Sequence, residues 1–201
     1  MDRKTEHRTA AGQSARQREQ QSASPHGDGG DMLRDVRRPA PQEFDIRIAA
    51  DGSWYHEGGL IGRPALVKLF ASVLRREADG SYWLVTPVEC GRIDVDDAPF
   101  TIIAAEFEGD GEGQVIRLRS NVDDDIILGP GHQLVMRRPP DGDDLRPYVT
   151  VRPGVEGRLG LEGRIARPVF YELAERGIEG PQGQIGVWSA GAFFSLEGGE
   201  A

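Results

Sequence analysis

Hydrophobic and polar side chains alternate along much of the chain from residue 45 onward, and this alternation predicts short β-strands. Segment 45–48 alternates, an Asp51-Gly52 turn follows, and segment 53–56 resumes the pattern, which together indicate a hairpin. Further strands are expected, separated by Gly, Asp and Pro turns, at 81–88, 91–95, 99–108, 113–121, 125–129 and 132–138. The pattern therefore predicts mostly antiparallel β structure.

One segment between these strands has the period of a helix instead. Within residues 63–74, the apolar side chains follow the i, i+3, i+4, i+7, i+8 spacing of one helix face, at positions 66, 69, 70, 73 and 74. Pro64 suits the first turn, because the N–H that proline lacks would have no partner there. We expect a helix that buries these five positions and ends before Asp79-Gly80.

The same order of elements recurs later in the chain. Residues 148–151 alternate like residues 45–48, and residues 165–173 then echo the segment 61–69 at a constant offset of 104. A glycine turn and an apolar strand follow in both places. The recurrence predicts an α+β fold in which a unit of antiparallel strands and one helix is duplicated.

Composition divides the chain into three parts. Residues 1–40 are rich in Gln, Ser, Arg, Gly and Asp and offer almost nothing to bury, so we expect a disordered tail. The remainder can bury roughly 70% of its unfolded surface, which is enough for a core. We expect an N-terminal α+β half over 41–96 and a C-terminal β-rich half with a helix over 97–201.

Charge limits the kinds of partner that the protein can have. The chain of 201 residues carries a net charge of −9, and residues 41–201 alone carry −11. Because so acidic a body repels a phosphate backbone, we expect no nucleic-acid binding. One small phosphorylated ligand in a local basic pocket stays compatible with this charge.

The sequence also indicates the cellular compartment in which the protein resides. The longest apolar runs are only a few residues, too short to span a bilayer, and the first residues lack the apolar core of a secretory signal. Cys90 is the one cysteine, so the chain forms neither an internal disulfide nor a multi-cysteine metal site. We expect a reduced, cytoplasmic protein that binds no membrane.

No motif for catalysis, metal binding or a cofactor stands out. The chain has no Gly-x-Ser-x-Gly turn and none of the standard glycine-rich phosphate loops. Asp123-Asp124-Asp125 is the sharpest acidic run, but neighbouring strand residues point to opposite faces, so solvated turn acids are the simpler interpretation. We therefore expect no catalytic residue, no metal and no cofactor, and favour a protein that is not an enzyme.

Several short motifs carry a resemblance to a known family. The most specific are Thr86-Pro87-Val88-Glu89 and Asp97-Ala98-Pro99-Phe100; weaker ones are Asn121 with Asp124, His132-Gln133-Leu134, 167–173 and 188–194. In these stretches the chain resembles the family known as domain of unknown function 1285, over residues 44–197. One departure is Cys90-Gly91, which stands where the family pattern suggests a basic residue.

The resemblance has implications for fold and function. It implies a duplicated α+β architecture whose second half is similar to a pleckstrin-homology-like barrel. It also implies a small-ligand site between the halves, for a nucleotide-like molecule, and a role in signalling. It carries no established activity over to this chain.

Two arginines are candidates for holding an anion. Arg63 and Arg167 each precede a proline that opens a helix, where a cation is unfavourable to the helix dipole. The free N–H groups at such helix starts favour an anion, so the two arginines could clamp a phosphate or carboxylate. The alternative is that each arginine faces solvent or pairs with an acid such as Glu57 or Glu162.

Asn121, Asp124 and His132 form a second candidate group, because the resemblance covers the same positions. Asn121 and Asp124 could equally cap a turn, which both residue types do readily. The leading hypothesis is therefore a non-enzymatic module that binds an anionic, nucleotide-like ligand between the halves. The alternatives are a protein-interaction adaptor, whose partner the sequence does not name, and a carboxylate-dependent hydrolase.

Overall fold

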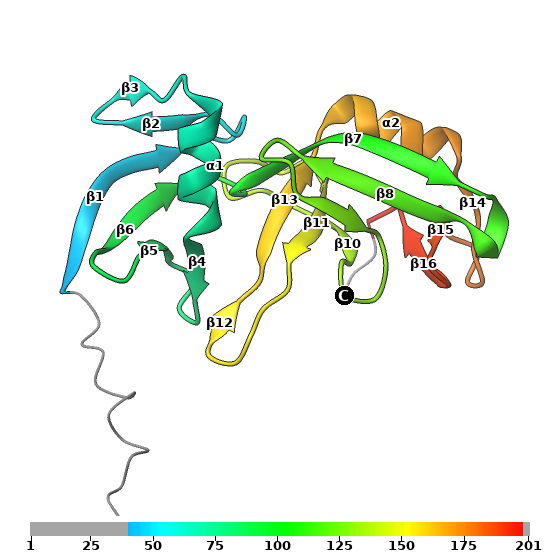
Figure 1. Ribbon diagram of the computed structural model, residues 1–201. Helices are drawn as coiled ribbons and strands as arrows, with labels where there is room; N and C mark the ends of the chain where they lie inside the picture. The colour runs from blue at the N-terminus through cyan, green and yellow to red at the C-terminus, as the bar shows by residue number, and fades with distance from the viewer. Residues whose placement is uncertain (1–39, 199–201) are drawn as a thin grey trace, which may run out of the picture. The chain divides into compact units, whose positions relative to one another are not determined.

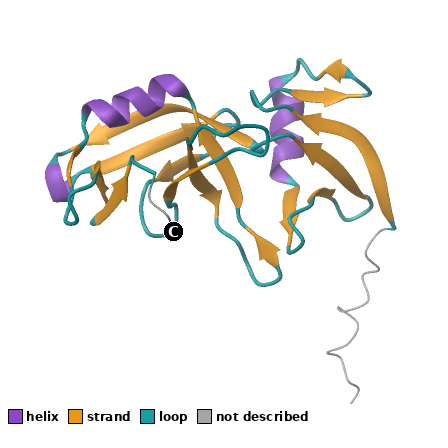
Figure 2. Cartoon of the chain, turned by 180° about the vertical axis from the view of Figure 1, so that it is seen from behind, coloured by secondary structure: helices purple, strands orange, loops and turns teal. Residues whose placement is uncertain are grey.

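A computed structural model of the chain describes residues 40–198, and the tail expected at 1–40 lies outside the described residues apart from its last position. The described part is mostly β structure with two helices (Figures 1 and 2). No helix in this part is long and apolar enough to cross a membrane.

The first main sheet has seven strands in the order β12-β4-β5-β6-β1-β2-β3. Six of them come from the N-terminal half, together with helix α1: β1 (Pro41–Ile48), β2 (Trp54–His56), β3 (Gly59–Leu60), α1 (Pro64–Ser72), β4 (Leu74–Glu77), β5 (Tyr82–Val85) and β6 (Cys90–Val95). β1 runs parallel to β6 and antiparallel to β2, so the sheet is mixed. The predicted hairpin over 45–56 is confirmed.

The second main sheet has six strands in the order β10-β11-β13-β7-β8-β9. Its strands and a short 3₁₀ turn are β7 (Phe100–Glu108), η1 (Gly111–Gly113), β8 (Val115–Ser120), β9 (Asp125–Ile127), β10 (Leu134–Arg137), β11 (Arg146–Arg152) and β13 (Leu161–Ile165). β9 and β10 are the two edges of this sheet, yet only residues 128–133 connect them. So short a connection requires the sheet to curl into a half-barrel.

The last elements cover one side of the half-barrel. They are α2 (Arg167–Glu175), β14 (Ile178–Glu179), β15 (Ile185–Ser189) and β16 (Ala192–Ser195). The three strands form a separate antiparallel sheet, and α2 packs against β7 and β15. α2 buries Val169 and Leu173, which fixes it on the half-barrel.

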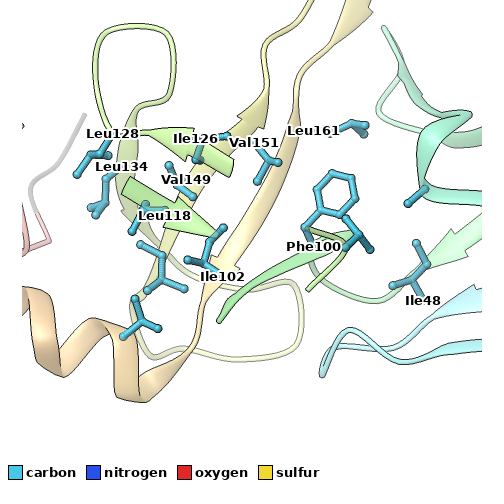
Figure 3. Packing of buried hydrophobic residues seen from close by; sticks show 14 of the residues in the cluster. Ile48, Phe100, Ile102, Leu118, Ile126, Leu128, Leu134, Val149, Val151 and Leu161 are labelled. Carbon is cyan, nitrogen blue, oxygen red and sulfur yellow. The ribbon is translucent and has the colours of Figure 1, made fainter. Parts of the chain in front are cut away.

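The core follows the inward side of the curled sheet. Figure 3 shows Ile102, Leu118, Val149 and Val151 from β7, β8 and β11 in this cluster, and all four side chains are buried. Phe100 belongs to the same cluster as Ile48 and Trp54 of the first sheet. One continuous core therefore joins the two main sheets.

Helix α1 differs from its prediction in where it ends and in which side chains it buries. It ends at Ser72, and the buried Leu74 instead begins β4, where it pairs with Leu84 of β5. Leu69 is 60% exposed, and Leu66, Phe70 and Val73 are only partly buried, so the expectation that all five positions are buried is wrong. The helix ends early because the β5 edge satisfies backbone groups that another helical turn would have used.

The structure shows only some of the features that the expected duplication predicts. Both helices have nine residues and a proline in the first turn. However, β4 and β5 join the same sheet as β1, whereas β14 and β15 form a sheet apart from β11 and β13. Duplication and likeness to a pleckstrin-homology-like barrel stay predictions.

Candidate functional site

The two main sheets are joined by a backbone crossing between β11 and β13. In this connection β12 (Arg158–Leu159) leaves the second sheet and pairs antiparallel with β4 of the first, which is visible in Figure 1. Gly154 allows the tight turn, because a Cβ there would lie 2.9 Å from the Arg158 carbonyl oxygen. The crossing places side chains of both halves around one small hollow.

This hollow is a pocket of about 220 Å³. It is lined by Leu74, Arg75, Arg76, Arg152, Pro153, Val155, Arg158, Leu159 and Leu161. We call it the arginine cleft, because four of its nine lining residues are arginines and none is acidic. In a region that carries a net charge of −11, this concentration of cations is the site's main electrostatic feature.

Arg152 is held firmly on three sides. Its Nη2 donates to both Asp124 carboxylate oxygens, at 3.1 and 2.8 Å, and its Nη1 donates to the Ala71 carbonyl oxygen. The guanidinium also lies 4.9 Å from the centre of the Phe100 ring. Ala71 is in the last turn of α1 and Asp124 is in the β8–β9 turn, so Arg152 ties the two halves together.

Arg76 is the second anchored arginine. Its Nη1 lies 3.8 Å from Glu162 Oε2, and its guanidinium lies 5.4 Å from the centre of the Tyr82 ring. The same Glu162 oxygen accepts a 3.0 Å hydrogen bond from Arg137. The Arg76 Nε is buried and has no hydrogen-bond partner within residues 40–198, which is a costly state for a polar group.

Arg75 and Arg158 are the two unpaired cations of the cleft. Each is partly exposed, and neither makes an ion pair or side-chain hydrogen bond with another residue of the described part. Arg158 lies opposite Glu77 in the strand register, and Arg75 is two residues from Glu77. Since alternate strand residues share a face, Arg75, Glu77 and Arg158 leave the sheet on the same side.

A buried polar network adjoins the cleft through Arg137. The Arg137 guanidinium lies 3.6 Å from the centre of the Tyr148 ring, and the Tyr148 hydroxyl donates to Asp97 Oδ1 at 2.7 Å. Asp97 Oδ2 is buried without a hydrogen-bond partner, with Arg146 Nη1 3.9 Å away. Burial and the hydrogen bond to Asp97 raise the pKa of Tyr148 to about 12.

Arg63 and Arg167 lie at the helix starts, as the sequence predicts. Arg63 is the N-cap of α1 and Arg167 is the first residue of α2, and both are exposed. No contact within residues 40–198 joins the two, and neither belongs to the arginine cleft. Glu162, a suggested partner, is instead engaged by Arg137 and Arg76.

Asn121 and Asp124 hold the chain together at the boundary between the halves. The Asn121 side chain accepts from the Thr101 N–H at 3.0 Å and donates to the Gly52 carbonyl oxygen at 3.4 Å. Asp124 makes the ion pair with Arg152. Of the five candidate residues, only Asp124 therefore touches a residue of the arginine cleft.

His132 belongs to a different hollow. Its Nδ1 lies 2.8 Å from the Thr150 carbonyl oxygen, which can only accept, so Nδ1 donates this hydrogen bond. His132 lines a pocket of about 450 Å³ on the β7–β8–β9 sheet, with Glu106, Arg117, Arg119 and Asp125 among the other lining residues. Neither Asn121 nor Asp124 lines this pocket, although Asp125 does.

The four arginines of the cleft were not among the sequence candidates. A signal was present, because Arg75-Arg76 and the Arg152–Arg158 segment concentrate cations in an otherwise acidic region. Their proximity depends on the two-residue strand β12, which no periodic pattern marks. In the described part of the chain, no group of three or more His, Cys, Asp or Glu side chains could hold a metal ion.

Comparisons with known proteins assign the chain to a family. Residues 37–98 match the model described as domain of unknown function (DUF1285), N-terminal domain, and residues 99–196 match the model described as protein of unknown function (DUF1285), C-terminal domain. No curated protein matches the chain. The two matches give the chain a two-domain architecture.

Two crystal structures of DUF1285 family proteins are similar to this chain. The protein from Silicibacter pomeroyi DSS-3 has 41% sequence identity and a TM-score of 0.72, covering 80% of this chain and 84% of that chain. The protein from Shewanella baltica OS155 has 26% identity and a TM-score of 0.46, covering 66% of this chain and 92% of that chain. With both of its domains matched, this chain belongs to the DUF1285 family.

Proposed function

We propose that this protein is a non-enzymatic module that binds a small anionic, nucleotide-like ligand in the arginine cleft between its two halves. One observation carries the proposal: four arginines and no acidic residue line a pocket in an acidic body. Arginine suits this role, because its planar guanidinium donates two parallel hydrogen bonds to a phosphate or carboxylate. A signalling role and a cytoplasmic location stay predictions from the sequence.

The size of the cleft indicates which part of a ligand it holds. Pockets that enclose a drug-sized molecule usually measure about 300–1,000 Å³, whereas the cleft measures about 220 Å³. We infer that the cleft takes the phosphate end of a ligand. The exposed side chains of Val155 and Leu159 then offer an apolar surface to the rest of the molecule.

The lining residues favour binding over catalysis. The cleft presents arginine and aliphatic side chains together with Pro153, and it contains no hydroxyl, thiol, imidazole or carboxylate. Such a lining supplies neither a nucleophile nor a general base. We therefore assign no catalytic residue to it.

The test uses the full-length protein, thermal denaturation and titration calorimetry. The probes are pyrophosphate, ATP and a cyclic dinucleotide, each with and without Mg²⁺. A ligand at one hundred times its Kd stabilises the folded state by about 2.7 kcal/mol. We expect this stabilisation in the wild type and its loss in the double variant Arg75→Ala/Arg158→Ala, because both side chains lack a partner and their removal spares the fold.

Two further variants make the result specific. Arg92→Ala removes an exposed arginine of β6 outside the cleft and should leave binding unchanged. Arg63→Ala/Arg167→Ala tests the clamp at the helix starts, and binding lost only in this variant would move the site there. Binding kept in Arg75→Ala/Arg158→Ala, or no stabilisation by any probe, would contradict the arginine cleft.

A further inference from the structure

A third hollow lies entirely within the N-terminal half and shares no residue with the arginine cleft. It has a volume of about 470 Å³. Its lining comes from β1, β2 and the turn after it, α1 and its C-cap, β5 and the β5–β6 turn: Glu43, Phe44, Asp45, Ile46, His56, Glu57, Phe70, Val73, Leu84, Thr86 and Glu89. We call it the acidic groove.

The floor of the acidic groove is apolar and firmly packed. Phe44, Phe70 and Leu84 belong to or pack against the hydrophobic core. Phe44 lies on the bare backbone of Gly91, where a Cβ would be only 2.2 Å from the ring. The pairing of β1 with β6 shifts register between Glu43 and Arg47, which bends β1 around the groove.

The rim of the groove carries one sign of charge. Four carboxylates line it, from Glu43, Asp45, Glu57 and Glu89; His56 is the one imidazole of the lining, and no lysine or arginine belongs to it. None of the four side chains makes an ion pair or a hydrogen bond within residues 40–198. The groove therefore offers unneutralised negative charge above an apolar floor.

The Thr86-Pro87-Val88-Glu89 motif forms one side of this groove as a fixed turn. The Thr86 hydroxyl accepts from the backbone N–H groups of Val88 at 3.3 Å and of Glu89 at 2.9 Å. The Thr86 N–H in turn donates to the Glu89 carbonyl oxygen at 2.8 Å. These bonds fix the turn with the Val88 side chain facing solvent, and this side chain is 79% exposed. Thr86 and Glu89, on either side of it in the turn, line the groove.

We propose that the acidic groove docks a basic, amphipathic segment of a partner protein. An apolar side chain of that segment fills the floor, and its lysines or arginines face the four carboxylates. Paired hydrophobic and charge complementarity is the usual basis of such peptide recognition. Val88 extends the apolar contact beyond the pocket, which fits a polypeptide better than a small cation.

The test is fluorescence anisotropy of the full-length protein with a labelled amphipathic peptide. The peptide carries Leu at helical i, i+3, i+4 and i+7 spacing and Lys at its other positions; a matched peptide has Glu in place of Lys. We expect the Lys peptide to bind at least tenfold more tightly than the Glu peptide. We also expect its affinity to fall as salt concentration rises, because the rim charges are exposed.

Charge reversal at the rim locates the site. Glu43→Lys/Glu89→Lys should weaken binding of the Lys peptide at least tenfold, and Val88→Ser should weaken it about threefold. The matched control Glu106→Lys/Glu108→Lys makes the same charge change on exposed positions of β7 and should change affinity less than twofold. Circular dichroism and melting curves check that each variant folds.

Three results would overturn the proposal. The first is equal weakening in the rim and control variants, which would mean unspecific attraction to an acidic protein. The second is no binding of either peptide. The third is binding that emerges only after Arg34, Arg37 and Arg38 are changed to Ser, since the occupant would then be the chain's own basic segment and not a partner.

Discussion

The arginine cleft and the acidic groove both use the seven-stranded sheet, yet they are built in opposite ways. The cleft needs β4 from the N-terminal half and residues 152–161 from the C-terminal half. The groove uses only residues 43–89, and every residue of its lining lies in the first family domain. The cleft should therefore respond to changes at the junction of the halves, whereas the groove should not.

Replacing Arg152 should give the largest difference between the two sites in their ability to bind a ligand. Arg152→Ala removes the ion pair with Asp124, the bond to the Ala71 carbonyl oxygen and the contact with Phe100. Because the pair is only partly buried, we expect a loss of about 2–3 kcal/mol of unfolding free energy, measured by urea denaturation. Anion binding at the cleft should fall with it. Peptide binding at the groove should persist, and its parallel loss would contradict the independence of the groove.

Gly91→Ala is the reciprocal change, aimed at the groove. The new methyl group would meet the Phe44 ring at 2.2 Å, so the ring must move out of the floor. We expect a cost of about 1–3 kcal/mol, together with weaker peptide binding and unchanged anion binding. Gly62→Ala is the matched control, because a Cβ at Gly62 meets nothing within 4 Å.

Tyr148→Phe tests how much the buried hydrogen bond between Tyr148 and Asp97 stabilises the fold. It leaves Asp97 Oδ1 without its donor, which should cost about 1–2 kcal/mol. The pKa of Tyr148 is raised from 10.0 to about 12, so the folded state holds this proton more tightly than the unfolded state. The contribution of Tyr148 to wild-type stability should then be fully present below pH 10 and be lost as the pH rises toward about 12. The variant should lack this pH-dependent contribution to the free energy of unfolding. If stability depended on pH in the same way in both proteins, the raised pKa of Tyr148 would be refuted.

The smallest effect is expected at an exposed ion pair across the same junction. Lys68 of α1 pairs with Asp123 of the β8–β9 turn, and the hydrogen bond from Lys68 lowers the pKa of Asp123. Any contribution is present above the ordinary aspartate value of 3.8 and is lost as the pH falls through the lowered pKa. Lys68→Ala should leave the Tm at pH 7 almost unchanged, because exposed pairs contribute little. A large drop would show that the junction depends on surface charge.

The strands were predictable where alternation alone determines them. The strand expected at 91–95 is β6, and the strand expected at 99–108 is β7, each within one residue. The strand expected at 81–88 stops at Val85, because Thr86 turns the chain with its hydroxyl. That turn depends on a side-chain hydrogen bond, which the alternation of hydrophobic and polar residues does not reveal.

The candidate site was less predictable for a related reason. The family resemblance suggested Asn121 and Asp124 as ligand contacts. In the structure, Asn121 bonds to backbone groups and Asp124 pairs with Arg152. The cleft arises because β12 pairs with a strand more than eighty positions earlier in the chain. Long-range pairing of so short a strand leaves no local signal in the sequence.

The pairing of β12 with β4 has a consequence for dissecting the protein. A fragment that stops at residue 98, where the first family domain ends, would lack Arg158 and Leu159, and the outer backbone groups of β4 would lose their partners. Open strand edges invite pairing with other chains, so such a fragment should self-associate when expressed alone. The boundary between the two sequence domains therefore does not mark two independently folding pieces, and the intact protein should unfold in one cooperative step.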